Sequence, residues 1–458
     1  MEWKRKFWHK WRKKLNSDHW AVASIKEVNA LLETSVVDIK CTREEFEMKL
    51  EKMFLAVKVP VKKRKKQELI NDVWRKSIDN FSILVESFIN RYQQKYFDLE
   101  VGFQDLVKMC NNEREREFLE LGFIIKKEYE RILKMISKPK IFKRYDQCYI
   151  DFNQLLVESI KYIEEGKADF EIKKIRILMI DEYQDFSKLF VKLVEAIRSR
   201  NEEIKLFCVG DNWQSINRFA GSEDSYYMNF RHNFDNSSTV EVSTNYRSLP
   251  YIINVTNEFM LKNEFQGNPA KFFKSGIQKS VMIHDIEGLI NNKENEEYLQ
   301  LFIDEDGNKE SKHILKAAYL KQCADIIKQN PTKDVLILHR MNRFINMQLK
   351  VFQNKLKKYF DSYGDSNILY DFDRKVSVKT MHSSKGSEAD VVIILEAVNG
   401  IIPMIHPDNQ LFSVFGETPR IVLDDEKKLF YVAMTRAKNE LHILTENKIK
   451  SDFLIGLW

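Results

Sequence analysis

The chain has 458 residues, of which 43% are hydrophobic and 31% charged, and its formal net charge is +6. This composition is typical of a soluble globular protein and excludes a disordered chain. The sequence has no run of 18 or more apolar residues and no secretory signal pattern, so neither a transmembrane helix nor export is expected. The five cysteines lack the paired spacing of a zinc site or a disulfide framework, which favours a cytoplasmic protein.

The first part of the chain, residues 1–145, is predicted to be helical. Amphipathic stretches at 69–96 and 113–136 carry apolar residues at helical spacing. Two clusters of basic residues, at 4–14 and 62–66, could contact phosphate groups. Solvated helix faces or loops account for these clusters equally well.

From about residue 175, short apolar runs alternate with helical segments. Runs of four to six apolar residues bounded by charges are typical of buried strands in parallel sheets. The predicted strands are 175–180, 205–209, 335–339, 391–395 and 440–444. Open α/β sheets bind ligands beyond the C-terminal ends of their strands, so the residues after these runs are candidate site residues.

The first of these strands ends in Asp181 and Glu182, within the run ILMIDEYQD. Proteins usually hold Mg²⁺ by one or two carboxylates together with phosphate oxygens. A second carboxylate beside the ligand can act as a general base for an attacking water. Most acidic pairs after a strand are structural, so this pair alone only suggests a nucleotide site.

Polar and aromatic residues follow the second strand and the segment after it. Within GDNWQSINRFAG, Gln214 could sense a phosphate, and Arg218 and Phe219 come shortly after it. An aromatic ring there could stack on a base of single-stranded nucleic acid, although an isolated phenylalanine is more often a core residue. The run NYRS presents Tyr246 and Arg247, which suits adenine stacking beside a cation for phosphate charge.

Two further blocks lie near the C-terminus. The stretch KTMHSSKGSEAD places Thr380, His382, Gly386 and Glu388 between two predicted strands. Gly386 allows close backbone approach to a phosphate or to DNA, and Glu388 could accept from a ribose hydroxyl. Since no other ligand lies at metal-site spacing, His382 suits a nucleic-acid contact better than a metal site. In FYVAMTRAK, Arg436 at the end of an amphipathic helix could act as an arginine finger.

In this order and at these spacings, the five blocks resemble the motor motifs of superfamily 1 DNA helicases of the UvrD/Rep/PcrA group. Their wording is closest to the helicase IV branch of that group. The resemblance implies ATP and Mg²⁺ as cofactors and single-stranded or partly duplex DNA as a partner. It also implies 3′-to-5′ translocation driven by closure of two RecA-like domains around ATP.

The resemblance assigns roles to the candidate residues. The catalytic and metal-binding set, in which Asp181 holds Mg²⁺ and Glu182 activates water, consists of Asp181, Glu182, Gln214, Arg247 and Arg436. The nucleotide-binding set consists of Tyr246, Gly386 and Glu388. The set that faces DNA consists of Arg218, Phe219, Thr380 and His382.

The same resemblance predicts an α/β fold with two RecA-like parallel-sheet motor domains, the first incomplete, and an inserted helical subdomain. Residues 1–145 would form the helical subdomain, and 146–250 the rest of the first RecA-like domain. Residues 251–330 would be connecting helices and a small insertion, and 331–458 the second RecA-like domain.

The sequence lacks the family's glycine-rich loop GxxGxGKT, whose backbone N–H groups cradle phosphates and whose lysine neutralises them. Only Gly102, Gly122 and Gly166 precede Asp181. Three interpretations stay open. The chain is a motor portion whose phosphate-binding segment is lost or supplied by a second chain, or a degenerate homologue that binds DNA or a partner without hydrolysis, or an unrelated α/β nucleotide hydrolase. The retained acidic pair, glutamine and arginines favour the first.

Overall fold

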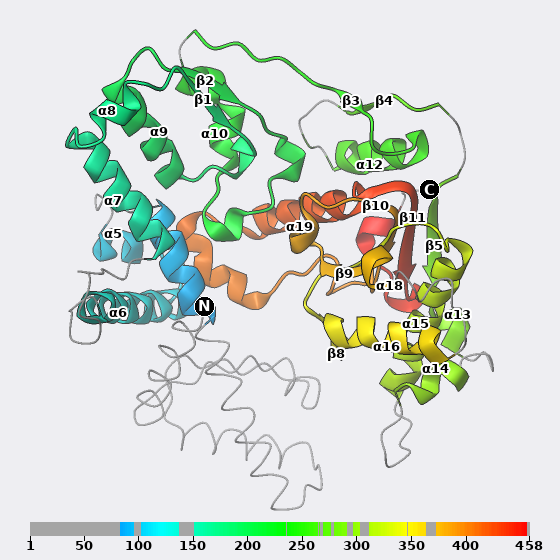
Figure 1. Cartoon of the computed structure of the whole chain (residues 1–458). Helices are drawn as coiled ribbons and strands as arrows, with labels where there is room; N and C mark the ends of the chain where they lie inside the picture. Colours follow the sequence, from blue (N-terminus) through cyan, green and yellow to red (C-terminus); the bar gives the residue numbers. More distant parts are fainter. Residues whose placement is uncertain are drawn as a thin grey trace, which may run out of the picture.

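The computed structural model describes residues 83–95, 102–136, 151–234, 236–263, 265, 269–275, 279–290, 296–302, 311–345, 347–362 and 372–455. The basic clusters at 4–14 and 62–66 lie outside these ranges. The described chain forms a helical subdomain, a small α/β domain and a larger α/β domain (Figure 1). None of the helices in these ranges is both long and apolar enough to cross a membrane.

The helical subdomain consists of a helix at residues 83–95, α5 (Phe103–Lys108) and α6 (Glu113–Ile136). Phe118, Leu121 and Ile125 recur at helical spacing along α6 and are buried, so α6 turns one apolar face inward. A Cβ atom at Gly122 would come within 2.7 Å of the Phe88 ring. The lack of a side chain at Gly122 therefore lets the two helices pack closely.

The small domain contains the helices α7 (Phe152–Glu164), α8 (Asp169–Ile172), α9 (Lys188–Arg200), α10 (Asp224–Met228) and α11 (Phe230–Asn233), and the strands β1 (Ile177–Ile180) and β2 (Lys205–Cys208). The two strands are parallel, with Ile177 opposite Lys205. The side chains of Asp151 and Ser187 cap the N-termini of α7 and α9. Leu178 of β1 packs against the core that α7 and α9 share, so these helices cover one face of the sheet.

The large domain is built on a parallel sheet with the strand order β5-β11-β10-β6-β9. Its strands are β5 (Val281–Asp285), β6 (Val335–His339), β9 (Val376–Thr380), β10 (Ala389–Ile394) and β11 (Ala437–Thr445). Its main helices are α12 (Pro250–Lys262), α15 (Ser311–Gln329), α16 (Leu349–Ser362) and α19 (Pro419–Met434). Helices α15 and α16 cover one face of the sheet, and α12 and α19 cover the other, each through its own apolar core.

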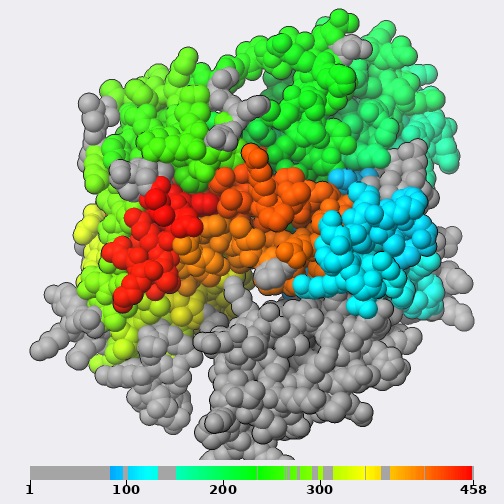
Figure 2. Space-filling view, turned by 180° about the vertical axis from the view of Figure 1, so that it is seen from behind, coloured from blue at the N-terminus to red at the C-terminus, as the bar shows by residue number. Residues whose placement is uncertain are grey.

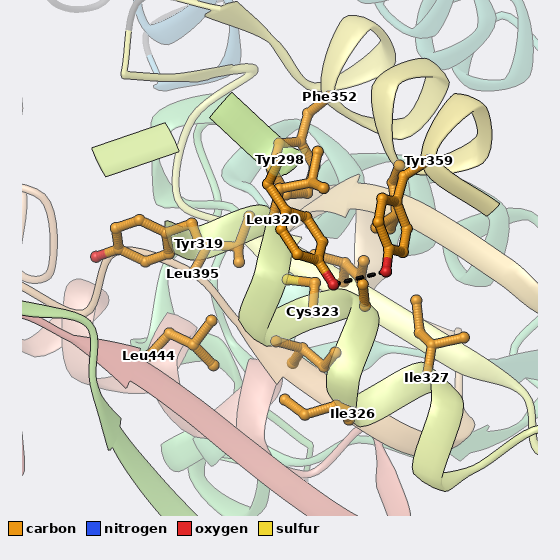
Figure 3. Close-up of a cluster of buried hydrophobic side chains, with 14 of the residues drawn as sticks. Tyr298, Tyr319, Leu320, Cys323, Ile326, Ile327, Phe352, Tyr359, Leu395 and Leu444 are labelled. Atoms are coloured by element: carbon orange, nitrogen blue, oxygen red, sulfur yellow. Dashed lines mark hydrogen bonds between the residues drawn. The ribbon is translucent and has the colours of Figure 1, made fainter. Parts of the chain in front are cut away.

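The core beneath α15 and α16 contains a pair of tyrosines among aliphatic side chains (Figure 3). Tyr298 of α14 (Glu296–Gln300) and Tyr359 stack with ring centroids 4.3 Å apart. Their hydroxyl oxygens are hydrogen-bonded at 2.7 Å. Each buried hydroxyl thus has a partner, which removes the cost of burying an unpaired polar group.

Short elements connect the main ones. The short helices are α13 (Glu287–Ile290) and α18 (Phe372–Lys375). The short strands are β3 (Thr244–Asn245) and β4 (Lys271–Phe272), which pair in parallel, and β7 (Arg343–Phe344) and β8 (Met347–Gln348), which pair antiparallel. The 3-10 turns are η1 (Tyr183–Asp185), η2 (Asn212–Gln214), η3 (Arg218–Ala220), η5 (His382–Ser384), η6 (Pro407–Phe415), η7 (Asn447–Ile449) and η8 (Asp452–Leu454).

The five strands predicted from apolar runs form as β1, β2, β6, β10 and β11. The α/β fold with a parallel sheet is therefore confirmed. Residues 251–330 contribute more than the expected connecting helices and insertion, because β5 is an edge strand of the large sheet and α15 lies in its core. Strand β5 was missed because its apolar run is short and most of its residues are only partly buried at the sheet edge.

The large domain reaches the helical subdomain through η6. Phe412 packs edge-to-face against Phe118 with centroids 5.8 Å apart, and the rings of Phe415 and Phe88 lie 5.7 Å apart. In the space-filling view, the helical subdomain (cyan) lies directly against the orange segment that carries η6 (Figure 2). Helix α19 begins just after η6, so the start of this helix is anchored to the helical subdomain.

Candidate nucleotide and nucleic-acid site

The acidic pair lies at the C-terminal end of β1. Glu182 has a left-handed backbone conformation with φ of 52°, which is uncommon for a residue with a Cβ atom. An oxygen of Asp181 accepts the backbone N–H of Glu182 at 2.9 Å. The carboxylate of Glu182 accepts a hydrogen bond from Gln184 and lies 3.0 Å from the ammonium of Lys385. A cation from the large domain therefore reaches one of the two carboxylates.

Gln214 joins the two α/β domains at a turn shortly after β2. Its side-chain N–H donates to Asp211 at 2.6 Å, and Asp211 also caps η2 by accepting from Trp213. The other end of the amide, Oε1, accepts from Nη2 of Arg436 at 3.3 Å. The amide of Gln214 is therefore held in position by an acid on its own domain and a cation on the other.

Arg436 lies between α19 and β11 and is only 2% exposed. Its Nε donates to the carbonyl of Val432 at 2.8 Å and its Nη1 to the carbonyl of Ser387 at 3.3 Å. Burial, and secondly the nearby charge of Arg247, lower the pKa of Arg436 to about 10. The guanidinium still carries its charge at neutral pH, so a buried cation faces the acidic turn of the small domain.

Tyr246 and Arg247 line one pocket together with Glu388. The pocket has a volume of about 570 Å³, and its other lining residues are Asn245, Lys274 and Lys438. One oxygen of Glu388 lies 2.7 Å from Nε of Arg247, and the other lies 2.7 Å from the ammonium of Lys438. Hydrogen bonds from Lys438 and then Arg247 keep the pKa of Glu388 below its ordinary value.

The pocket has an aromatic rim. The side chain of Tyr246 is exposed, and the ring of Phe273 lies against it with centroids 4.7 Å apart. A planar base could stack on such an exposed ring while phosphate groups meet the cations of the pocket.

Gly386 follows Lys385 on the way to β10. Its φ of +76° favours glycine, and a Cβ atom there would meet no other atom within 4 Å. Glycine is therefore favoured at this position by the backbone conformation and not by a close contact, and the space beside its Cα atom is open.

Two of the four residues expected to face DNA lie in contact with each other. The rings of Phe219 and His382 meet edge-to-face with centroids 5.4 Å apart. Burial, and secondly Arg340, lower the pKa of His382 to about 4, so its ring is neutral at pH 7. Thr380 is nearby in sequence, and its hydroxyl is hydrogen-bonded to Ser383 at 2.9 Å.

Arg218, also expected to face DNA, is engaged in ion pairs within the protein. Its guanidinium lies 3.0 Å from Asp425 of α19 and 3.2 Å from Asp224. Lys428 of α19 pairs with the same Asp224. These partners make Arg218 part of the interface between the two α/β domains, and a role in DNA binding stays a prediction.

Three lysines of the site had no role predicted from the sequence. Lys385 lies 2.7 Å from Asp185 and 3.0 Å from Glu182, and it also donates to the carbonyl of Gln214. Lys438 and Lys274 line the pocket. Two features of the sequence could have indicated these roles. Lys385 directly precedes Gly386, and Lys438 lies two residues after Arg436.

Asp181 fits a magnesium site of the usual kind. Its carboxylate is exposed at the strand end, beside Glu182. One or two carboxylates with phosphate oxygens and water are the common Mg²⁺ ligands in nucleotide enzymes. Within the described ranges, no group of three or more His, Cys, Asp or Glu side chains gathers as a metal site.

Residues 9–235 match the UvrD/REP helicase N-terminal domain, and residues 361–448 match the UvrD-like helicase C-terminal domain. The chain belongs to the UvrD/Rep family of superfamily 1 helicases.

Curated relatives agree with this family. DNA helicase IV of Escherichia coli is 27% identical over 311 residues, which cover 67% of this chain and 38% of that protein. The putative ATP-dependent DNA helicase YjcD of Bacillus subtilis is 24% identical, covering 69% of this chain and 56% of its own length. The Rep helicase of Buchnera aphidicola is 26% identical over 48% of this chain and 30% of its own. The chain thus spans about a third to just over half of these relatives.

Proposed function

We propose that this chain is the motor portion of a cytoplasmic ATP-dependent DNA helicase that translocates 3′ to 5′ along single-stranded DNA. The observation that carries the proposal is the junction of the two α/β domains, where Gln214 meets Arg436 at 3.3 Å. The pocket at Tyr246 is tied to that junction, since Arg247 donates to the carbonyl of Thr435 at 3.4 Å. A nucleotide that extended from this pocket to Gln214 would contact residues of both domains, so its hydrolysis could drive their closure.

Each residue of the acidic turn and the junction would have its own part in hydrolysis. Asp181 would hold Mg²⁺, which would neutralise phosphate charge and orient the terminal phosphoryl group. Glu182 would accept a proton from the attacking water, for which its carboxylate has to leave Lys385. Gln214 would sense the γ-phosphate, and Arg247 and Arg436 would stabilise the charge of the transition state.

The exposed rings of the site support a role for base stacking. Tyr246 would stack on the adenine, and Glu388 would accept from the ribose. Phe219 and His382 would contact single-stranded DNA through base stacking that tolerates any sequence.

The proposal includes a phosphate-binding segment that these 458 residues do not contain. Each phosphate of a nucleoside triphosphate needs hydrogen-bond donors and positive charge, which a glycine-rich loop normally supplies. A second chain that carries such a loop would complete the site. A homologue that binds DNA without hydrolysing ATP is the competing function, and the ion pair between Lys385 and Glu182 suits such a resting state.

A measurement of steady-state ATP hydrolysis distinguishes the proposed helicase from the non-hydrolysing homologue. The chain would be assayed with oligo-dT, alone and with a recombinant family segment that carries GxxGxGKT. The proposal expects turnover only with both DNA and the segment, and loss of that turnover in Glu182→Gln but not in the matched control Glu171→Gln. Absence of turnover in every combination, with DNA binding intact, would favour the non-hydrolysing homologue.

A further inference from the structure

The last turn of the helix at residues 83–95 is buried although most of its side chains are polar. Arg91, Tyr92, Gln93 and Gln94 are each between 5% and 9% exposed. A helix at the surface of a protein normally turns its polar residues to water. Buried polar side chains need hydrogen-bond partners, and here segments of both α/β domains supply them. The turn is therefore a place where the three parts of the described chain meet.

Both ends of the Gln94 amide are hydrogen-bonded to the small domain. Its side-chain N–H donates to Oδ1 of Asn153 in the first turn of α7, and its Oε1 accepts from the hydroxyl of Ser187, the N-cap of α9. The amide of Asn153 in turn donates to Gln93 at 3.0 Å. The direction of the Gln94 side chain is therefore fixed, because a rotation of the amide would break both bonds.

The side chain of Gln94 lies directly against the end of η3. Gly221 closes this turn with φ of +94°. A Cβ atom at Gly221 would come within 2.5 Å of Cβ and 2.9 Å of Cγ of Gln94. Two residues earlier, η3 carries Phe219, whose exposed ring contacts His382. The backbone that presents the Phe219 ring therefore rests on Gln94.

The residue after Gln94 ties the same turn to the large domain. The ammonium of Lys95 lies 3.3 Å from Glu223, which follows η3, and donates to the carbonyl of Phe415 in η6 at 3.0 Å. In Figure 1 the helix (blue) lies beside α7 and the orange segment that carries η6. Movement of η3 would therefore break contacts with the helix end at two neighbouring residues.

We propose that the last turn of the helix at 83–95 holds η3 in place, with Gln94 as the positioning residue for the Phe219 ring. A ring that is already held in its binding position avoids the cost of being ordered when DNA binds. Gln94 itself is buried, so its effect on DNA affinity passes through the ring. The inference rests on the proposed function in one respect, because it takes Phe219 as a DNA contact.

Two substitutions disturb the contact from opposite sides. Gln94→Ala removes the hydrogen bonds and the Cγ atom, and Gly221→Ala adds a Cβ atom that overlaps Gln94. Gln104→Ala, at an exposed glutamine of α5, is the matched control for the first. Gly400→Ala is the control for the second, because Gly400 has φ of +84° but no other atom within 4 Å of a Cβ there. This control shares the backbone strain and lacks the overlap.

The first measurement is binding of labelled oligo-dT to the intact chain by fluorescence anisotropy at fixed salt. Gln94→Ala and Gly221→Ala should each weaken binding by about 3- to 30-fold, and both controls should bind as the unaltered chain does. The double variant Gln94→Ala, Phe219→Ala should bind no more weakly than Phe219→Ala alone. A loss that adds fully to that of Phe219→Ala would overturn the inference, since Gln94 would then act elsewhere.

The second measurement needs no DNA and reports on the ring itself. 4-Fluorophenylalanine at position 219 gives one ¹⁹F NMR signal that depends on the surroundings of the ring. Gln94→Ala and Gly221→Ala should each shift or broaden this signal, and the two controls should leave it unchanged. A loss of stability alone would not move the signal of the folded protein. An unchanged signal in Gln94→Ala would therefore also overturn the inference.

The outcomes separate this inference from the proposed function. If the ¹⁹F signal moves as expected and Phe219→Ala binds oligo-dT as the unaltered chain does, Gln94 positions the ring and the proposed DNA contact fails. If Phe219→Ala weakens binding and Gln94→Ala does not, the DNA contact stands and the positioning role of Gln94 is wrong.

Discussion

The side chains of Gln214 and Arg436 meet at 3.3 Å although they are 222 residues apart in the sequence. One follows a strand of the small domain and the other follows α19 of the large domain. The contact therefore reports the distance between the two domains at the place where a nucleotide would act on both. Since Arg436 is buried and charged, movement of Gln214 would leave a buried cation without one of its partners.

This coupling can be measured. We expect Gln214→Ala and Arg436→Lys each to lower the free energy of unfolding, because each removes a partner of a buried polar group. The double variant should be less destabilised than the sum of the two single variants, by about 0.5–3 kcal/mol. Urea unfolding of the four proteins completes the cycle, and strict additivity would show that the contact does not form in solution.

The ion cluster along α19 predicts a pH dependence of stability. Burial raises the pKa of Asp425 to about 6 from an ordinary 3.8, in opposition to the nearby Arg218 and Lys428. Between these pH values the folded protein binds the proton that the unfolded chain has lost. The free energy of unfolding should therefore fall as the pH rises from about 4 to about 6, by up to about 3 kcal/mol, and stay level above.

Asp425→Asn should remove this part of the pH profile, because the amide does not titrate. Asp424→Asn, at the adjacent and more exposed position, serves as the control. Urea unfolding at intervals between pH 4 and 7 measures the difference, and an unchanged profile in Asp425→Asn would assign the titration to another group.

Where the helical subdomain meets the large domain, a buried ion pair is expected to contribute to the stability of the protein. Arg91 forms a two-pronged ion pair with Glu417, and its guanidinium lies 4.1 Å from the centre of the Phe412 ring. Removing one partner of a buried pair leaves an unpaired charge, so Glu417→Gln should cost about 3–5 kcal/mol of stability. Asp105→Asn, in an exposed pair on α5, should cost much less. Urea unfolding compares the two variants. Equal decreases in the free energy of unfolding would show that the buried pair contributes no more to stability than the exposed pair.

Because the ring of Phe219 is exposed, we expect it to contribute measurably to the affinity of the protein for DNA. Stacking of a base on an aromatic ring contributes about 1–3 kcal/mol, so Phe219→Ala should weaken binding of oligo-dT by about 5- to 150-fold. Fluorescence anisotropy at fixed salt measures the effect. Phe190→Ala, another partly exposed phenylalanine of the small domain, should bind as the unaltered chain does. Equal affinities for all three proteins would remove Phe219 from the DNA-binding surface.

Much of the fold could be predicted because buried parallel strands leave a local signature in the sequence. The runs that became β6 and β10 are almost continuously apolar, as strands covered on both faces of a sheet usually are. Asp181 and Glu388 were singled out as candidates because the first follows the apolar run of β1 and the second precedes that of β10. The edge strand β5 lacked this signature, since most of its residues are only partly buried.

Partners distant in the chain could not be predicted from one sequence. Nothing local to Arg218 indicates that it pairs with Asp425, which lies 207 residues away. The same holds for Lys385, whose partner Asp185 lies 200 residues away. Such pairs depend on how the two α/β domains are placed, which the spacing of motifs along the chain does not specify.

The pocket at Tyr246, which is tied to the junction of the two α/β domains, is the proposed nucleotide site. Photolabelling of the chain with 8-azido-ATP, followed by peptide mass spectrometry, tests it directly. We predict an adduct on the peptide that contains Tyr246 or on the one that contains Phe273, with labelling reduced by excess ATP and by Arg247→Ala, but not by the control Phe272→Ala. Specific, ATP-competed labelling only at positions remote from this pocket would contradict it.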